Sequence, residues 1–287
     1  EPQPLIDVRN QAILARQNGL EPIFVVDPLN GLNRSEFMGL PGGWQASFSE
    51  RRVREAYRAF TLWILETFEP RYLGLASEIN TYADAHPQDF AHFLSLYDET
   101  YAAIKQARPQ TRVFVTFQWE DLNNLIPAVS EGRKPYQINW DQVEAFEPQL
   151  DLWVISSYPF IAFRSAAEIP PDYYSPLLAR TSKPLAVAEG GYTSAPVGPA
   201  AGSPEDQAGY LQAIHTQIGS RLAFWIYLLL TDLDLDSYAG LMESNGVPDR
   251  DIDTLGMFAF VGLQTKEGDA KPALEVWDAI RREGGGP

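Results

Sequence analysis

The stretch YLGLASEIN, residues 72–80, joins a buried strand to polar chemistry at the end of that strand. Its first five residues are apolar or small and suit a buried strand, but the run ends in Ser77, Glu78 and Asn80. A buried strand has little use for a carboxylate unless that group points into solvent or into a site. The stretch therefore predicts a strand whose carboxyl end opens onto a functional site.

Several other segments repeat this pattern of an apolar strand with a polar or aromatic end. Segments with the periodicity of amphipathic helices separate them. The predicted strands are PIFVVD (22–27), YLGLASE (72–78), RVFVTFQ (112–118), LDLWVISSY (150–158), PLAVAE (184–189) and LAFWIYLLL (222–230). The predicted helices cover residues 6–19, 49–68, 87–107, 140–146, 172–180, 203–219 and 272–282.

The alternation of strands and helices narrows the fold class. Near-continuous apolar strands indicate parallel strands buried on both faces, in a (β/α) barrel or a doubly wound sheet. None of the predicted strands runs into a Gly-rich phosphate loop, which disfavours a nucleotide-binding sheet. The polar strand ends favour a barrel, because all its strands end on one face, where the active site lies. We therefore expect an α/β fold of (β/α)8 TIM-barrel type, as one domain over residues 1–287.

Composition disfavours several partners. The net charge of −16 and pI near 4.6 would repel nucleic acid and anionic lipid over most of the surface. No window approaches the roughly 18 consecutive apolar residues of a membrane span. The absence of cysteine excludes disulfides and thiolate sites but leaves the compartment open, a secreted location included. A neutral partner is favoured, and no cofactor is expected.

Two carboxylates stand at predicted strand ends. In a closed barrel, Glu78 and Glu189 end strands that are three apart, so the two side chains can face each other across the mouth. Retaining glycosidases need two carboxyl groups about 5–5.5 Å apart, one as general acid/base and the other as nucleophile. The pair therefore predicts glycoside hydrolysis.

Longer motifs carry a family resemblance over residues 72–280. SEIN (77–80), AEGGY (188–192) and SSYPF (156–160) resemble the strand-four, strand-seven and strand-six ends of a clan of retaining (β/α)8 glycoside hydrolases. The closing FAFVGLQTKEGDAKPALEVWDAI (258–280) resembles the tail of such enzymes. The likeness is greatest to the endo-β-galactanase-type members.

The resemblance implies roles for individual residues. Glu78 would protonate the glycosidic oxygen and later activate water, Glu189 would attack the anomeric carbon, and Tyr158 would orient Glu189. It also implies a raised pKa for the acid and a lowered pKa for the nucleophile. Alternatively, Tyr158 is a core residue at the barrel rim. A carbohydrate is the expected substrate.

Other polar or aromatic residues near strand ends are candidates for sugar binding. Trp119 would stack on a sugar or merely plug the mouth, and Trp225 or Tyr227 would form the floor. Asp27 would bind hydroxyls or stabilise its own loop. Asp232 lies in the acidic stretch TDLDLDS, which suits a solvated loop better than a calcium site. The full candidate set is Asp27, Ser77, Asn80, Trp119, Glu120, Tyr158, Tyr192, Trp225 and Asp232.

The sequence departs from the clan in two respects. Ser77 stands where the clan usually places an Asn that contacts the sugar 2-hydroxyl. If Glu78 ends strand four, the strand at 22–27 is the third and only one helix precedes it, so strands one and two are missing. We expect an incomplete N-terminus, or closure by another chain or an unusual N-terminal arrangement. Unpaired edges invite association, so copies of this chain are expected to meet through the open edge.

Other chemistries receive little support from the residues. The three histidines, His86, His92 and His215, lie within or just before predicted helices, so neither a catalytic triad nor a zinc site is expected. A metal-dependent barrel hydrolase is the weakest alternative. The stronger one is a non-catalytic carbohydrate-binding or scaffold barrel that keeps the two glutamates. The sequence does not determine which sugar or linkage is cleaved, or whether cleavage is internal or terminal.

Overall fold

A computed structural model of the protein describes residues 3–126, 132–244 and 247–283. Its centre is a set of parallel strands, paired in the orders β1-β4-β5 and β6-β7-β8-β9. Only Val115 separates β5 from β6, so the two continue one strand path. The strands are β1 (Phe24–Val25), β4 (Tyr72–Gly74), β5 (Arg112–Phe114), β6 (Thr116–Gln118), β7 (Trp153–Ser157), β8 (Leu185–Gly190) and β9 (Leu222–Trp225). All six predicted strand positions are confirmed.

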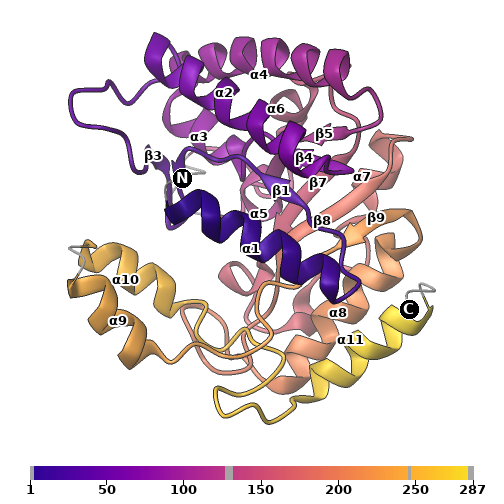
Figure 1. Ribbon diagram of the computed structural model, residues 1–287. Helices are drawn as coiled ribbons and strands as arrows, with labels where there is room; N and C mark the ends of the chain where they lie inside the picture. The colour runs from indigo at the N-terminus through magenta and orange to yellow at the C-terminus, as the bar shows by residue number, and fades with distance from the viewer. Residues whose placement is uncertain (1–2, 127–131, 245–246, 284–287) are drawn as a thin grey trace.

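Helices surround these strands (Figure 1). All seven predicted helices are confirmed: α1 (Gln3–Gln17), α2 (Arg51–Phe68), α4 (Pro87–Ala107), α6 (Trp140–Glu144), α7 (Ser175–Arg180), α8 (Pro204–Ile218) and α11 (Pro272–Glu283). In Figure 1, α2 and α4 lie along the upper side and α8 and α11 at the lower right. Helix starts follow local chemistry, as at Ser203, whose side chain caps α8 by accepting from the Asp206 N–H.

Some short elements were not predicted. Helix α5 (Trp119–Leu122) begins directly after β6, and helix α3 (Ile79–Ala85) begins directly after the segment 72–78 that was predicted as strand. The long loop expected after the first strand contains an antiparallel hairpin, β2 (Leu29–Asn30) and β3 (Asn33–Phe37). The acidic stretch expected to be a loop leads instead into α9 (Leu235–Ser244), which pairs with α10 (Asp249–Gly256) at the lower left of Figure 1.

The barrel is open, as the strand count predicts. Among the described residues, no strand precedes β1, and β1 and β9 do not pair with each other. Packing of aromatic side chains nevertheless joins β9, at one end of the strand series, to β4 and β5. The Phe224 ring of β9 lies 5.1 Å from the Tyr72 ring of β4 and 5.8 Å from the Phe114 ring of β5, between centroids. These contacts curve the sheet, because apolar burial holds β9 against β4 and β5 without backbone hydrogen bonds.

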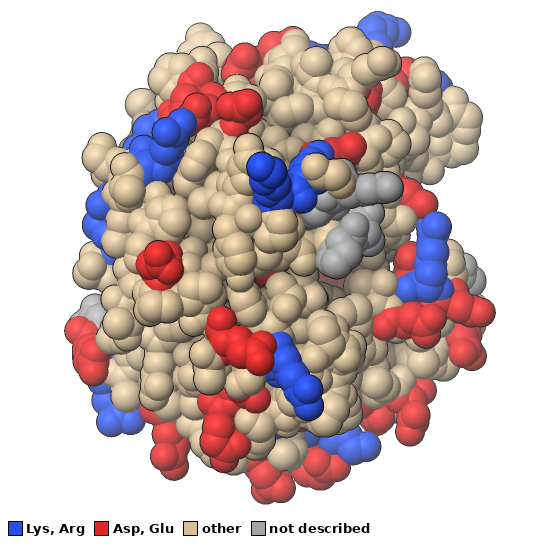
Figure 2. All heavy atoms as spheres, turned by 180° about the vertical axis from the view of Figure 1, so that it is seen from behind, with Lys and Arg blue, Asp and Glu red and all other residues tan. Residues whose placement is uncertain are grey.

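The surface carries the negative charge of the composition. On the face that Figure 2 shows, acidic side chains gather along the lower edge, with basic side chains scattered among other residues. None of the described helices has the length and hydropathy that crossing a membrane requires.

Candidate active site

A cavity of about 570 Å³ lies where strands β4, β6, β7 and β8 end. Glu78, Gln118, Tyr158 and Glu189 follow or end these four strands, and all four line the cavity. Parallel strands of a barrel direct their carboxyl ends to one face. The fold therefore brings the two predicted catalytic glutamates, more than a hundred positions apart in sequence, into one site.

Glu78 occupies an uncommon backbone conformation. It has φ of 50° and ψ of 42° at the start of α3, in the left-handed region that non-glycine residues rarely adopt. Such a conformation costs on the order of 1–3 kcal/mol and persists where the surrounding structure enforces it. Here the Glu78 N–H donates to Thr116 Oγ1 at 2.8 Å. This backbone geometry directs the carboxylate toward the cavity instead of continuing the strand.

The Glu78 carboxylate has a partner on each oxygen. Ser156 Oγ donates to Oε1 at 2.5 Å, and Arg34 Nε donates to Oε2 at 3.1 Å. Arg34 belongs to the β2–β3 hairpin and also forms a salt bridge of 2.5 Å to Asp27. The side chains of this Asp27–Arg34–Glu78 cluster are each at most 14% exposed, so solvent screens the charges weakly.

A β-bulge and a glycine set the position of Glu189. In the pairing of β7 with β8, Ile155 lies opposite Val187 and Ser156 opposite Glu189, so Ala188 is the extra residue. Bulges of this kind change the direction of a side chain. The following Gly190 is required by close packing, because a Cβ at this position would lie 2.3 Å from the Tyr210 hydroxyl.

The pKa of Glu189 differs from the expectation. Burial and the nearby Glu78 charge raise it to about 7, although the Tyr158 hydrogen bond and Arg34 act in the opposite direction. The expected lowering of the Glu189 pKa is therefore wrong. Tyr158 OH donates to Glu189 Oε1 at 2.6 Å, and its predicted orienting role would act through this contact.

Two predicted sugar-binding residues form a buried layer behind the site. Glu120 is fully buried and accepts hydrogen bonds from Ser157 Oγ at 2.7 Å and from the Tyr158 N–H at 2.9 Å. Trp119 is also fully buried, with its ring about 6.1 Å from those of Trp140 and Tyr173. The prediction that these two side chains contact a sugar is wrong, because both face inward from α5.

Asn80 is likewise buried and cannot reach a ligand directly. Its Nδ2 donates to Asp121 Oδ2 at 2.8 Å, and its Oδ1 accepts from the Gln118 N–H at 2.8 Å. Ser77 lies 9% exposed beside Thr116 and outside the cavity lining. These side chains support the strand ends that carry Glu78 and Gln118, so sugar contact by Asn80 is a wrong prediction.

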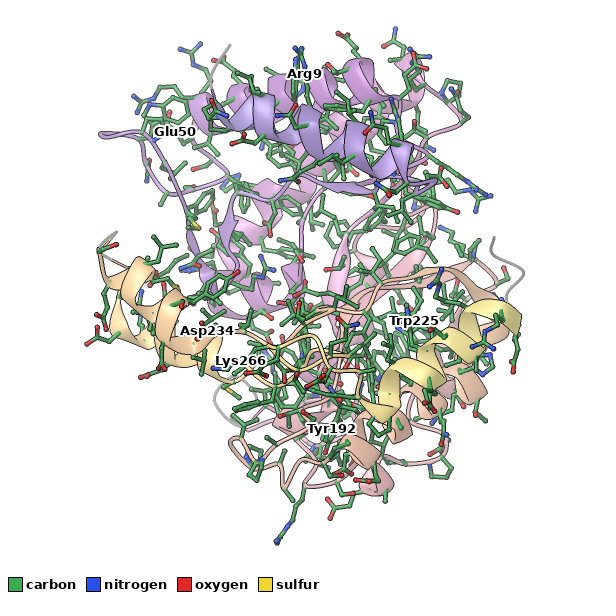
Figure 3. The ribbon with its side chains drawn as sticks, turned by 60° about the horizontal axis from the view of Figure 1, so that its bottom comes forward. Arg9, Glu50, Tyr192, Trp225, Asp234 and Lys266 are labelled. Atoms are coloured by element: carbon green, nitrogen blue, oxygen red, sulfur yellow. The ribbon has the colours of Figure 1, made fainter. Side chains whose placement is uncertain are left out.

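The remaining candidates also lie outside the cavity lining. Trp225 points outward from β9 toward α11, where its ring meets that of Trp277 at 5.1 Å (Figure 3). Tyr192 is buried and donates to the Phe163 carbonyl at 3.0 Å. Asp232 forms a buried 2.6 Å salt bridge with Lys271. Strand parity explains why the Trp225 side chain points away from the cavity, because alternate residues face opposite sides of a strand.

Arg34 has a central position in the site that no sequence motif indicated. The only signal was an arginine within the loop that follows a predicted strand. Among the described residues, no group of three or more His, Cys, Asp or Glu side chains is arranged to hold a metal ion. The cavity thus holds Arg34, Glu78, Gln118, Tyr158 and Glu189, and Asp27 is paired with Arg34 but lies outside the cavity lining.

Comparison with known proteins identifies the fold. No protein-family model matches the sequence, and no curated protein sequence matches it. Among solved structures, the GH53 catalytic domain of Ignisphaera aggregans superimposes with a TM-score of 0.63 at 16% identity, over 94% of this chain and 77% of that one. A fungal β-1,4-galactanase gives 0.62 at 14% identity, over 94% and 80%.

A third structure points in the same direction. The exo-β-1,4-mannosidase Op5Man5 from Opitutaceae bacterium strain TAV5 has a TM-score of 0.63 at 16% identity, over 96% of this chain and 49% of that one. The chain therefore has the barrel fold of these glycoside hydrolases, and the resemblance predicted from its motifs is confirmed at the level of the fold.

Proposed function

We propose that this protein cleaves a β-glycosidic bond with retention of configuration. The observation that carries the proposal is that Glu78 and Glu189, from the ends of two barrel strands, line one cavity and are close enough for the Glu78 charge to raise the pKa of Glu189. Two carboxyl groups sharing a site are the machinery that double displacement requires. The backbone strain at Glu78 supports the proposal, since such strain concentrates at functional sites.

In the first step, Glu189 attacks the anomeric carbon while Glu78 donates its proton to the glycosidic oxygen, and the alcohol departs. Glu189 is then joined to the sugar as an ester. In the second step, Glu78 takes a proton from water, the water oxygen bonds to the anomeric carbon, and Glu189 leaves. Tyr158 stabilises the charged form of Glu189 at the start and end of this cycle.

Chemical rescue tests the two roles separately. With an activated dinitrophenyl β-glycoside, the Glu78→Ala variant keeps the first step, because this leaving group needs no proton, and added azide yields a β-glycosyl azide. The Glu189→Ala variant loses turnover and yields the α-azide. Inversion in the wild-type reaction, followed by NMR, or unchanged turnover in Glu189→Ala would contradict the proposal.

The Arg34–Glu78 salt bridge favours a second candidate function, a carbohydrate-binding barrel without turnover. A general acid must carry a proton, whereas a bound guanidinium favours a charged carboxylate. Binding of a glycoside to the wild-type protein, with no hydrolysis of the activated substrate, would support this function in place of hydrolysis.

A further inference from the structure

The cavity has two chemically different sides. The side with Glu78, Gln118, Tyr158 and Glu189 is polar and comes from strand ends. Aliphatic and aromatic side chains supply most of the remainder. Six of them come from the segment after β9, from the last turn of α10 and the residues after it, and from the hairpin turn: Leu228, Leu229, Leu233, Leu255, Phe258 and Leu32. Ile126 and Ile161 complete the apolar lining.

This apolar wall is a poor partner for a second sugar. A pyranose carries hydroxyl groups that lose hydrogen bonds to water on burial, and leucine side chains replace none of them. Stacking is also limited, because the Phe258 ring packs edge-on against Tyr158, at 4.9 Å and 73°. An apolar group, in contrast, gains from leaving water in proportion to the area that it buries.

Backbone hydrogen bonds fix the wall relative to the reacting groups. The Leu228 N–H donates to the carbonyl of Gly190, the residue after Glu189, at 2.9 Å, and the Leu233 N–H donates to Ala259 at 3.0 Å. On the far side, Asn30 Nδ2 of the hairpin donates to Asp251 Oδ2 of α10 at 3.0 Å. The wall is therefore preformed beside the nucleophile, and a total volume of about 570 Å³ suits one small ligand.

We infer that the cavity binds a single sugar on its polar side and an apolar aglycone, an alkyl or aryl group, on its leucine-rich side. The inference rests on the proposed function for the identity of the cleaved bond. The substrate class is then the β-glycosides of apolar alcohols, and a chain of sugars is a poorer substrate. The apolar wall and the carboxylate pair line the same cavity, so the group that occupies the wall is the aglycone of the cleaved bond.

Binding tests the inference independently of turnover. We would titrate the Glu189→Gln variant with propyl and hexyl β-D-galactosides by calorimetry, and run β-D-glucosides and β-D-mannosides in parallel. Affinity should rise about fourfold for each methylene that enters the wall, so the hexyl compound should bind about 10- to 60-fold more tightly than the propyl compound. Equal affinities, or no binding of either compound in all three series, would overturn the inference.

Wild-type turnover separates this inference from the proposed function. The kcat/KM for the hexyl glycoside should exceed that for the propyl glycoside by the same factor as the affinity, since the two leaving groups have nearly equal acidity. Tight hexyl binding without any hydrolysis would sustain the apolar site and reject the glycosidase. Faster hydrolysis of the matching β-linked disaccharide than of the hexyl glycoside would sustain the glycosidase and reject the apolar site.

Two adjacent leucines provide a matched pair of variants. Leu229 lines the cavity, whereas Leu230 is 61% exposed and does not. Leu229→Asn should remove at least about tenfold of the hexyl preference and leave propyl binding within about twofold. Leu230→Asn should preserve both the hexyl preference and the affinity for the propyl glycoside. Equal loss of hexyl preference in the two variants would overturn the inference. If Leu229→Asn fails to fold, as judged by circular dichroism, Leu255→Asn takes its place.

Discussion

The Tyr158 hydroxyl donates a 2.6 Å hydrogen bond to Glu189 Oε1, and the Tyr158 N–H donates a 2.9 Å bond to Glu120 Oε2. One residue thus links a fully buried carboxylate behind the site to the proposed nucleophile inside it. A buried acceptor that fixes the backbone of a donor reduces the freedom of that donor. Glu120 therefore acts as a positioning residue for Tyr158 and, through it, for Glu189.

Replacing Tyr158 with phenylalanine should lower kcat/KM about 10- to 100-fold, because hydrogen bonds to charged groups contribute about 1.5–3 kcal/mol. The hydroxyl lowers the pKa of Glu189, so its loss should raise that pKa further. A nucleophile must be charged, and the acidic limb of the pH–rate profile should consequently move to higher pH. Tyr192→Phe, a buried control outside the cavity, should leave the limb in place.

Arg34→Met should also move the acidic limb of the pH–rate profile to higher pH. Arg34 lowers the pKa of Glu189 by its positive charge, so removing that charge raises the pKa. Arg34→Lys keeps the charge and should retain most of the wild-type profile. Stability should also fall, since Asp27 loses its 2.5 Å ion-pair partner in a mostly buried position. A profile that stays unchanged in Arg34→Met would argue against an electrostatic role.

Glu120→Gln should flatten the pH dependence of stability. Burial raises the folded-state pKa of Glu120 from 4.5 to about 7. Its contribution is fully present below pH 4.5 and is lost as pH rises to about 7, because the unfolded chain ionises first. The difference corresponds to about 3 kcal/mol. Urea unfolding at several pH values between these limits should show a shallower decline for the variant.

The absolute stability of that variant should be lower at the acidic end. A glutamine amide brings two donors to a position where Glu120 accepts from Ser157 and Tyr158. The stability of Glu120→Gln should still decline somewhat as pH rises, since burial also raises the pKa of Asp121 to about 7. An identical slope in the wild type and Glu120→Gln would mean that Glu120 titrates normally.

Asp251→Ala should loosen α10 from the hairpin and raise KM for the hexyl glycoside several-fold. Asp251 is 5% exposed and accepts from Asn30, so its removal leaves a polar partner unpaired at a cost of about 1–3 kcal/mol. The neighbouring Arg250→Ala removes the exposed salt bridge to Glu36 and a 3.5 Å contact with Asp251 Oδ1 but keeps the Asn30–Asp251 bond, so it should change KM little. Faster amide exchange within residues 235–244 and 249–256 of Asp251→Ala would show the loosening directly.

Much of this protein is determined by local sequence. Strand positions, the seven predicted helices and the open barrel follow from hydrophobic periodicity and from counting strands, because these patterns depend on residues close together in the chain. Glu78, Tyr158 and Glu189 were also identifiable, since each stands at or beside a strand end and parallel strands end on one face.

Tertiary structure decided the rest. Whether Trp119, Glu120 and Trp225 face the cavity depends on strand parity and on the short helix α5, neither of which a few polar residues can specify. Arg34 enters the site because the β2–β3 hairpin folds back over the strand ends, and the leucine wall forms because α10 packs against that hairpin. Such contacts join residues up to 221 positions apart. Their energies depend on burial and charge in three dimensions, so the linear pattern does not encode them.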